Sequence, residues 1–366
     1  MRTNFLSEFF EKTCLTPAHI SVGITIFLFS FSMVFISRYS RLNNTAAIRT
    51  DSTRVVYLYH DSNIHQLNKI LTKNEIQHDS LNLFWASHLL GWRKFKQGRY
   101  VINHDYSYNS FLKRLAMGIQ SPIRVTILPG QTKKHFVKEV AGHFLFSADS
   151  LEKTMADSSV LASLGANKKD IYGRMLPDTY LFYWNMSPKE FLGKMLHEFH
   201  RLVVDKYKDR FTKLNKSVDQ ILTLASIVEW EAKVDSEKPV ISGLYWNRLK
   251  KGWPLQADPT INYIIGERRR LLYKDYRIKS PYNTYINKGL PPEPITNPSL
   301  SSIKAALYPD SNDYMYMVAQ PNGEHAFART LAKHKRQSER WRRWLRKQYR
   351  IKRERERAAA DSLKAK

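Results

Sequence analysis

The sequence predicts an α+β protein held by a single membrane-spanning helix, and three observations carry this prediction. An uncharged apolar stretch lies near the N-terminus, short β-rich and helical segments alternate behind it, and a longer, mainly helical region follows. With 366 residues, 43% of them apolar, the chain is long enough for two domains with separate cores. Cys14 is the only cysteine, so the fold relies on packing without an internal disulfide.

The apolar stretch Ile20–Ser37 has 18 residues and no charge. At ~1.5 Å per residue, a helix of this length nearly crosses a hydrocarbon core of ~30 Å. The flanking Ser37-Arg38-Tyr39-Ser40 is a poor signal-peptidase site, which favours a retained anchor. Arg2 and Lys12 precede the stretch and four arginines follow it by residue 54, so the charge count does not define the orientation. We therefore expect an N-terminal segment (1–19), a transmembrane helix (20–37) and a polar linker (38–54).

Residues 55–128 have the pattern of a small module of strands and helices. β-branched and aromatic residues predict the strands, and apolar residues at intervals of three and four predict the helices. The expected order is strand (55–59), helix (63–71), strand (99–102), helix (110–117) and strand (123–127).

Residues 129–332 are expected to form a mixed α+β domain. Apolar spacing predicts helices over 132–144 and 188–206, and alternation around Pro321-Asn322-Gly323 predicts a β-hairpin. In His197-Glu198-Phe199-His200 the histidines are three residues apart, not four, and no third ligand follows, so we expect no metal and no cofactor.

Thr330 is the expected N-cap of a final helix that carries a basic tail, residues 333–366. This tail contains fifteen lysines and arginines against four acidic residues, a large share of the net charge of +26. Trp341, Trp344, Leu345 and Tyr349 would form a narrow apolar stripe on it, which suits either a solvated helix or a helix on an anionic surface. No zinc-finger or RNA-binding motif accompanies the charge, so we expect no nucleic-acid partner.

A capping box formed by Ser217 and Gln220 predicts the start of a helix that stays apolar through Val228. Two glutamates follow, Glu229 on the face of Leu222 and Glu231 on a different face. Because two carboxylates on so apolar a helix cannot both be buried at low cost, at least one borders a polar cavity.

Three polar, proline-stiffened loops follow this helix: Leu255-Gln256-Ala257-Asp258-Pro259-Thr260, Ser280-Pro281-Tyr282-Asn283-Thr284-Tyr285, and Gly289-Leu290-Pro291-Pro292 continuing to Ile295-Thr296-Asn297-Pro298. In this order, the helix and loops resemble the endolytic murein transglycosylases, the YceG-like family. Leu176–Tyr180, Asn247–Leu249 and Gly323–Phe327 extend the resemblance. Two elements depart from the family pattern: its usual Glu-Gly reads Tyr172-Gly173, and its Pro-Glu-Gly turn reads Leu128-Pro129-Gly130.

The resemblance implies cleavage of MurNAc–GlcNAc bonds inside nascent glycan strands, leaving 1,6-anhydroMurNAc ends. It implies that Glu229 is the catalytic glutamate, and Glu231 is a second candidate. It further implies a LysM-like module at residues 55–128, a cytoplasmic N-terminus, and a catalytic domain on the periplasmic side of the inner membrane near the peptidoglycan synthases. The loop residues expected to bind the sugar chain are Gln256, Asp258, Thr260, Asn283, Thr284, Tyr285 and Asn297.

Two other functions remain open on the residues themselves. A glutamate with a pKa of ~4.3 is a poor proton donor at neutral pH, but apolar surroundings raise that pKa, as they do for the acid of lysozyme. A muramidase would add a second carboxylate, Asp258 or Glu231, to activate water. A non-catalytic scaffold would bind peptidoglycan through the small module and the basic tail.

Overall fold

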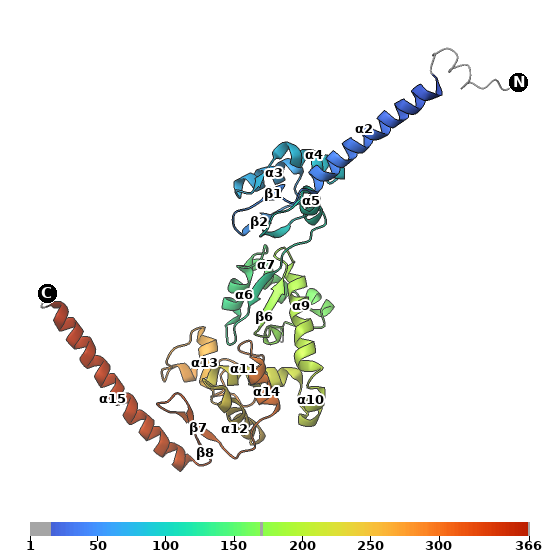
Figure 1. The fold of residues 1–366 in the computed structure, drawn as a ribbon. Coiled ribbons are helices and arrows are strands. Elements are labelled where there is room, and N and C mark those ends of the chain that lie inside the picture. The colour runs from blue at the N-terminus through green and yellow to red at the C-terminus, as the bar shows by residue number, and fades with distance from the viewer. Residues whose placement is uncertain (1–15, 169–170, 365–366) are drawn as a thin grey trace. The chain divides into compact units, whose positions relative to one another are not determined.

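A computed structural model describes residues 16–168 and 171–364 (Figure 1). The chain divides into two compact units. The first runs to Pro122 and includes Tyr183–Asn185, and the second consists of Ile123–Phe182 and the chain from Met186 onward. The sequence placed this division later, after residue 128.

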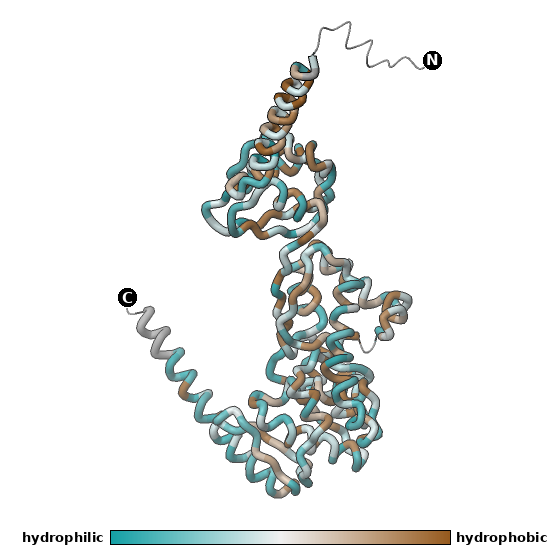
Figure 2. The backbone as a smooth tube through the Cα atoms, turned by 45° about the vertical axis from the view of Figure 1, so that its right-hand side comes forward, coloured by the Kyte–Doolittle hydropathy of each residue, from teal (hydrophilic) through white to brown (hydrophobic). Residues whose placement is uncertain are grey.

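The first described element is the apolar helix α2 (Pro17–Asn43), which begins at the N-cap Thr16. Its segment Ala18–Asn43 is long and apolar enough to cross a membrane, and its large apolar side chains are exposed. Figure 2 shows much of α2 in brown, the colour of hydrophobic residues. The helix continues past Ser37, so the first part of the predicted linker is helical, and Arg41 lies 4.5 Å above the ring of Trp85. The predicted segment 1–19 lies largely outside the described residues.

The rest of the first unit is built around the antiparallel pair of β2 and β4, in which Val56 faces Tyr100. Between these strands the chain forms two helices, α3 and α4, where the sequence predicted one helix, over residues 63–71. The sequence pattern did not locate α4, because its apolar residues lie nearly all around it. The elements are β1 (Ile48–Arg49), β2 (Arg54–Leu58), α3 (Ile64–Lys73), β3 (Gln77–His78), α4 (Ser80–Leu90), β4 (Gly98–Ile102) and α5 (Tyr108–Ala116).

The second unit opens with the antiparallel pair of β5 and β6, in which Val125 faces Tyr180. The predicted strand 123–127 therefore forms, but it pairs inside the second unit and does not close the small module. Helix α9 ends at Phe199 and continues as one π-helical turn. The elements are β5 (Ile123–Thr126), α6 (Lys133–Ala141), α7 (Ala148–Ala156), α8 (Ser158–Ser163), η1 (Tyr172–Arg174), β6 (Thr179–Phe182), α9 (Pro188–Phe199), η2 (His200–Val204) and α10 (Lys208–Leu214).

The remaining elements surround helix α11, and their core includes Ile227, Leu244 and Ile303. The predicted hairpin is confirmed as the pair β7 and β8. Thr330 caps the start of α15 as predicted, because its Oγ1 atom accepts a hydrogen bond from the Lys333 backbone N–H. The elements are α11 (Val218–Glu231), η3 (Asp235–Glu237), α12 (Lys238–Lys250), α13 (Asp258–Ile265), η4 (Asp275–Arg277), α14 (Leu300–Leu307), β7 (Tyr316–Ala319), β8 (His325–Ala328) and α15 (Leu331–Lys364).

Candidate active site

Helix α11 positions both candidate glutamates in its last turn. Its N-terminus is fixed by the predicted capping box: the Ser217 hydroxyl accepts from the backbone N–H of Gln220, whose side chain accepts from the backbone N–H of Ser217. The helix is buried from Ile221 to Val228, so its apolar residues are covered all round. It ends at Glu231 because Ala232 is extended.

Glu229 is enclosed by hydrogen-bond donors. Its Oε2 accepts from the backbone N–H of Ser299 at 2.9 Å, from the Ser299 hydroxyl at 2.5 Å and from the Ser302 hydroxyl at 2.6 Å. The ammonium of the buried Lys238 lies 3.5 Å from the same oxygen. A carboxylate with this many donors on one oxygen is fixed as an acceptor.

The position of Glu229 has an electrostatic explanation. The C-terminal end of a helix carries a partial negative charge, so a carboxylate in the last turn of α11 needs compensation. Ser299 is the N-cap of α14, whose N-terminus carries the opposite partial charge. Lys238 adds a full positive charge, which it shares with Asp235 at 2.8 Å. Glu229 therefore joins α11 to the starts of α12 and α14.

The surroundings of Glu231 differ from those of Glu229, because they lack hydrogen-bond donors to the carboxylate among the described residues. It is half-buried, and no hydrogen bond to its carboxylate is found within the part of the chain described. Burial and the nearby charge of Asp258 raise the pKa of Glu231 to about 7, although the Arg248 guanidinium acts in the other direction. A carboxyl group with this pKa is partly protonated at neutral pH and can donate its proton.

Asp258 begins α13 and is exposed on the side of the helix end that Glu231 occupies. Its Oδ1 accepts a hydrogen bond from the Tyr285 hydroxyl, and the Tyr285 ring packs edge-on against Tyr276, 4.6 Å away. Gln256, just before it, has a φ of +51°, a left-handed conformation that is uncommon outside glycine. Its side chain is exposed, and Asp258, bound by Tyr285, is the polar group whose charge acts on Glu231.

The other predicted sugar-binding residues are buried and satisfy their polar atoms inside the protein. The Asn283 amide donates to the carbonyls of Tyr276 and Ile278, and Thr260 and Thr284 are hydrogen-bonded to each other at 2.9 Å. Asn297 donates to the Leu128 carbonyl. These side chains hold the loops together.

Gly130 shows why the turn Leu128-Pro129-Gly130 packs closely on α11. Its φ is +69°, and a Cβ atom there would lie 3.3 Å from the Trp230 ring. The Trp230 indole N–H donates to the Gly130 carbonyl at 2.7 Å, and the Gly130 N–H donates to the Asn297 carbonyl. This turn therefore fixes the end of the helix that bears the glutamates.

Two residues of α12 complete the surroundings of Glu231, and the sequence motifs did not single them out for the site. Arg248 is buried and donates to the carbonyls of Met315 and Leu255, while its charge acts on Glu231. The hydroxyl of Tyr245 is buried without a partner among the described residues, and burial together with the charge of Glu231 raises the Tyr245 pKa. Their positions three residues apart on one helix face were the available signal.

Comparison with known proteins identifies the family. The sequence profile of the YceG-like family matches residues 56–340. The chain belongs to this family. The match begins at strand β2 and reaches into α15, so it includes both glutamates, the three loops and the hairpin.

Relatives with assigned names agree with this family. An endolytic murein transglycosylase of Bacillus subtilis is 31% identical over 296 residues, which are 76% of this chain and 82% of that protein. A protein of the same name from Streptococcus pneumoniae is 26% identical, and the match covers 70% of this chain but only 52% of that longer protein. The crystal structure of a YceG-like protein from Listeria monocytogenes superposes with a TM-score of 0.56 at 29% identity, covering 78% of this chain and 99% of that one.

Proposed function

We propose that this protein is an endolytic murein transglycosylase in which Glu231 is the proton donor. The observation that carries the proposal is the half-buried Glu231 carboxyl, whose pKa is raised to about 7 beside the exposed Asp258. The names of the relatives from B. subtilis and S. pneumoniae support murein glycan strands as the substrate and lytic cleavage as the reaction.

The proposed role of Glu231 reverses the order that the sequence suggested for the two glutamates. Three hydrogen bonds and the Lys238 contact engage the Oε2 atom of Glu229 and tie this side chain to α12 and α14. No such contact to Glu231 is found among the described residues, and its environment favours the protonated form. We therefore assign Glu229 to the support of the helix end.

The proposed reaction requires one titrating carboxyl group. The Glu231 carboxyl donates its proton to the bridging oxygen as the bond from the MurNAc C1 breaks. The C6 hydroxyl of the same MurNAc then attacks C1, and the Glu231 carboxylate takes the proton of that hydroxyl. The new bond joins C1 to O6, no water is consumed, and the enzyme regains its proton. Asp258, held by Tyr285, acts in this scheme through its charge, which helps to keep the proton on Glu231.

The two-carboxylate muramidase is the second candidate, because Asp258 lies close enough to Glu231 to affect its pKa. Mass analysis of the products of purified glycan strands separates the functions. We expect 1,6-anhydroMurNAc ends, lighter by one water than reducing ends. Reducing ends alone would favour a hydrolase in which Asp258 activates water. Strand binding without cleavage would favour a scaffold.

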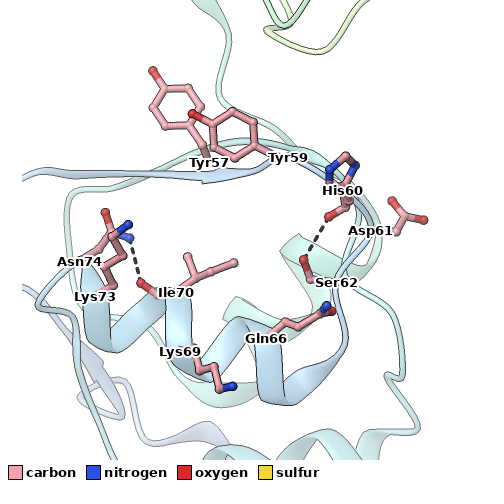
Figure 3. A pocket seen from close by; sticks show the side chains of 10 residues that line it. All are labelled: Tyr57, Tyr59, His60, Asp61, Ser62, Gln66, Lys69, Ile70, Lys73 and Asn74. Atoms are coloured by element: carbon pink, nitrogen blue, oxygen red, sulfur yellow. Dashed lines mark hydrogen bonds between the residues drawn. The ribbon is translucent and has the colours of Figure 1, made fainter.

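We further propose that the first unit is a LysM-like module that binds glycan strands. Figure 3 shows Tyr57 and Tyr59 on one side of a cavity of about 550 Å³, with α3 on the other. Both rings pack edge-on against Trp184, at 4.9 and 5.2 Å, and both are accessible for stacking on a sugar. In a catalytically inactive Glu231→Gln background, Tyr59→Ala should weaken co-sedimentation with insoluble peptidoglycan; unchanged binding would contradict this role.

We also propose that α2 is a single-pass anchor in the bacterial cytoplasmic membrane and that both units lie on its outer side, near the peptidoglycan synthases. The exposed apolar surface of α2 supports the anchor, and the wall polymer named for the relatives supports the location. Protease added to spheroplasts should digest the chain beyond Asn43 and spare an N-terminal tag. Protection of the C-terminal part would overturn this topology.

A further inference from the structure

A cavity of about 660 Å³ lies beside the candidate active site, in the second unit. Asp258 and Tyr276 line it on the side of the glutamates, Arg270 and Leu272 line it from the loop after α13, and Trp341 and Arg342 line it from α15. We call it the arginine pocket. Its volume is within the range of small-ligand sites. Its α15 wall lies just beyond residue 340, where the match to the family ends.

The arginines that line this pocket differ in whether they are paired with a carboxylate. Arg269 forms a two-pronged ion pair with the buried Asp275, at 2.8 and 3.0 Å, and this guanidinium holds the Asp275 pKa at about 2. Arg269 is thereby neutralised and anchors the loop. Arg270 and Arg342 are exposed, and neither forms an ion pair with a side chain that the structure describes. Two guanidiniums therefore face one lining carboxylate, Asp258, whose Oδ1 accepts from the Tyr285 hydroxyl, and an excess of positive charge remains for an anion.

The wall from α15 is held against the loop by specific contacts. Arg270 donates to the Tyr349 hydroxyl at 2.8 Å and lies over the Tyr349 ring at 5.6 Å. Trp341 stacks on Trp344 at 4.9 Å, and Leu345 adds an apolar surface to the pocket. The aromatic stripe of the basic tail thus lies partly against the catalytic unit.

We propose that the arginine pocket binds a carboxylate of the peptide attached to the glycan strand, with Arg270 and Arg342 as its ligands. This inference rests on the proposed function, because murein carries carboxylate-bearing peptides on its MurNAc residues. Asp258 lines the pocket and also lies beside Glu231. The ligand must therefore belong to a sugar close to the bond that is cleaved. A guanidinium pair suits a carboxylate, and Trp341 and Leu345 suit the aliphatic parts of a peptide. The pocket would make the enzyme prefer strands that retain their peptides.

The test compares the full chain in detergent on two purified substrates, strands that carry peptides and strands freed of them by an amidase. We expect kcat/KM about tenfold higher on the peptide-bearing strands, and Arg342→Gln should bring this ratio close to one without changing cleavage of the bare strands. Arg343→Gln is the matched control, because this exposed arginine is the next residue on α15 and does not line the pocket.

An unchanged ratio in Arg342→Gln, or an equal loss on both substrates, would overturn the inference and leave the proposed function intact. If the wild-type chain cleaves neither substrate, the proposed function fails, and binding then decides the inference. In that case, Arg342→Gln should lower affinity for peptide-bearing strands about tenfold and leave affinity for bare strands unchanged. Equal affinities of the wild-type chain for both strands would overturn it.

Discussion

Glu229 and Glu231 lie two residues apart in the last turn of one helix, yet their surroundings are opposite. Glu229 is held by two serines and a lysine from α12 and α14, whereas Glu231 lies beside a second carboxylate, Asp258. Both carboxylates lie at the negative end of the α11 dipole, which disfavours them. Among the described contacts, the N-terminus of α14 compensates Glu229 and not Glu231. The environment of a carboxylate therefore depends on the elements packed against it more than on the helix that carries it.

The largest effect should follow from Glu231→Gln. The amide keeps the shape of the side chain and removes the titrating proton, so strand cleavage should fall about 10²–10⁴-fold while strand binding is retained. Product release from purified strands and co-sedimentation measure the two quantities. Full activity of the folded variant would return the acid role to Glu229.

Glu229→Gln should affect stability first. The variant leaves Lys238 without its partner on α11 and replaces a charged acceptor of three hydrogen bonds, so we expect the free energy of unfolding to fall by about 2–3 kcal/mol. Urea unfolding of the chain gives this value. At a temperature where the variant is folded, cleavage should stay within about tenfold of the wild type. A loss as large as that of Glu231→Gln, in a folded variant of unchanged stability, would contradict the structural role.

The sequence was sufficient for the features that depend on local chemistry. The capping box at Ser217, the hairpin β7–β8 and the N-cap at Thr330 were predicted correctly because each depends on residues a few positions apart. Helix α4 was not located, since a helix that is apolar nearly all round has no clear period.

The surroundings of the two glutamates could not be obtained in this way. Ser299 and Ser302 lie about seventy residues after Glu229 in the chain, and no pattern within α11 indicates that they meet it. The sequence also does not show which polar loop residues are buried and which are exposed. Asn283 and Asn297 turn inward to satisfy backbone carbonyls, while Asp258 and Gln256 on similar loops are exposed. Residue type alone does not separate these cases.

The two glutamates should also differ in how they affect stability with pH. The pKa of Glu231 is about 7 in the folded protein and ~4.3 in an unfolded chain, so the folded state binds more protons between these values. Stability should therefore decrease as pH rises from about 4.5 to 7, and Glu231→Gln should remove this part of the decrease. At pH 8 that variant should be more stable than the wild type by about 1–3 kcal/mol, the opposite sign to Glu229→Gln. Urea unfolding at pH 5 and pH 8 measures both.

Asp258→Asn should have the smallest effect. Removing the charge of Asp258 takes away one of the two causes that raise the Glu231 pKa, and burial, the larger cause, remains. The upper limb of the pH–rate profile, where Glu231 loses its proton, should move to lower pH by less than about one unit. The rate at the optimum should fall only modestly, since Tyr285 can still donate to the amide oxygen. The muramidase mechanism predicts a different result: if Asp258 activates water, Asp258→Asn should cost about as much as Glu231→Gln. Three results together would identify Glu231 and Asp258 as a catalytic pair: a loss of that size, an unmoved upper limb of the pH–rate profile, and reducing ends in the product of the wild-type enzyme.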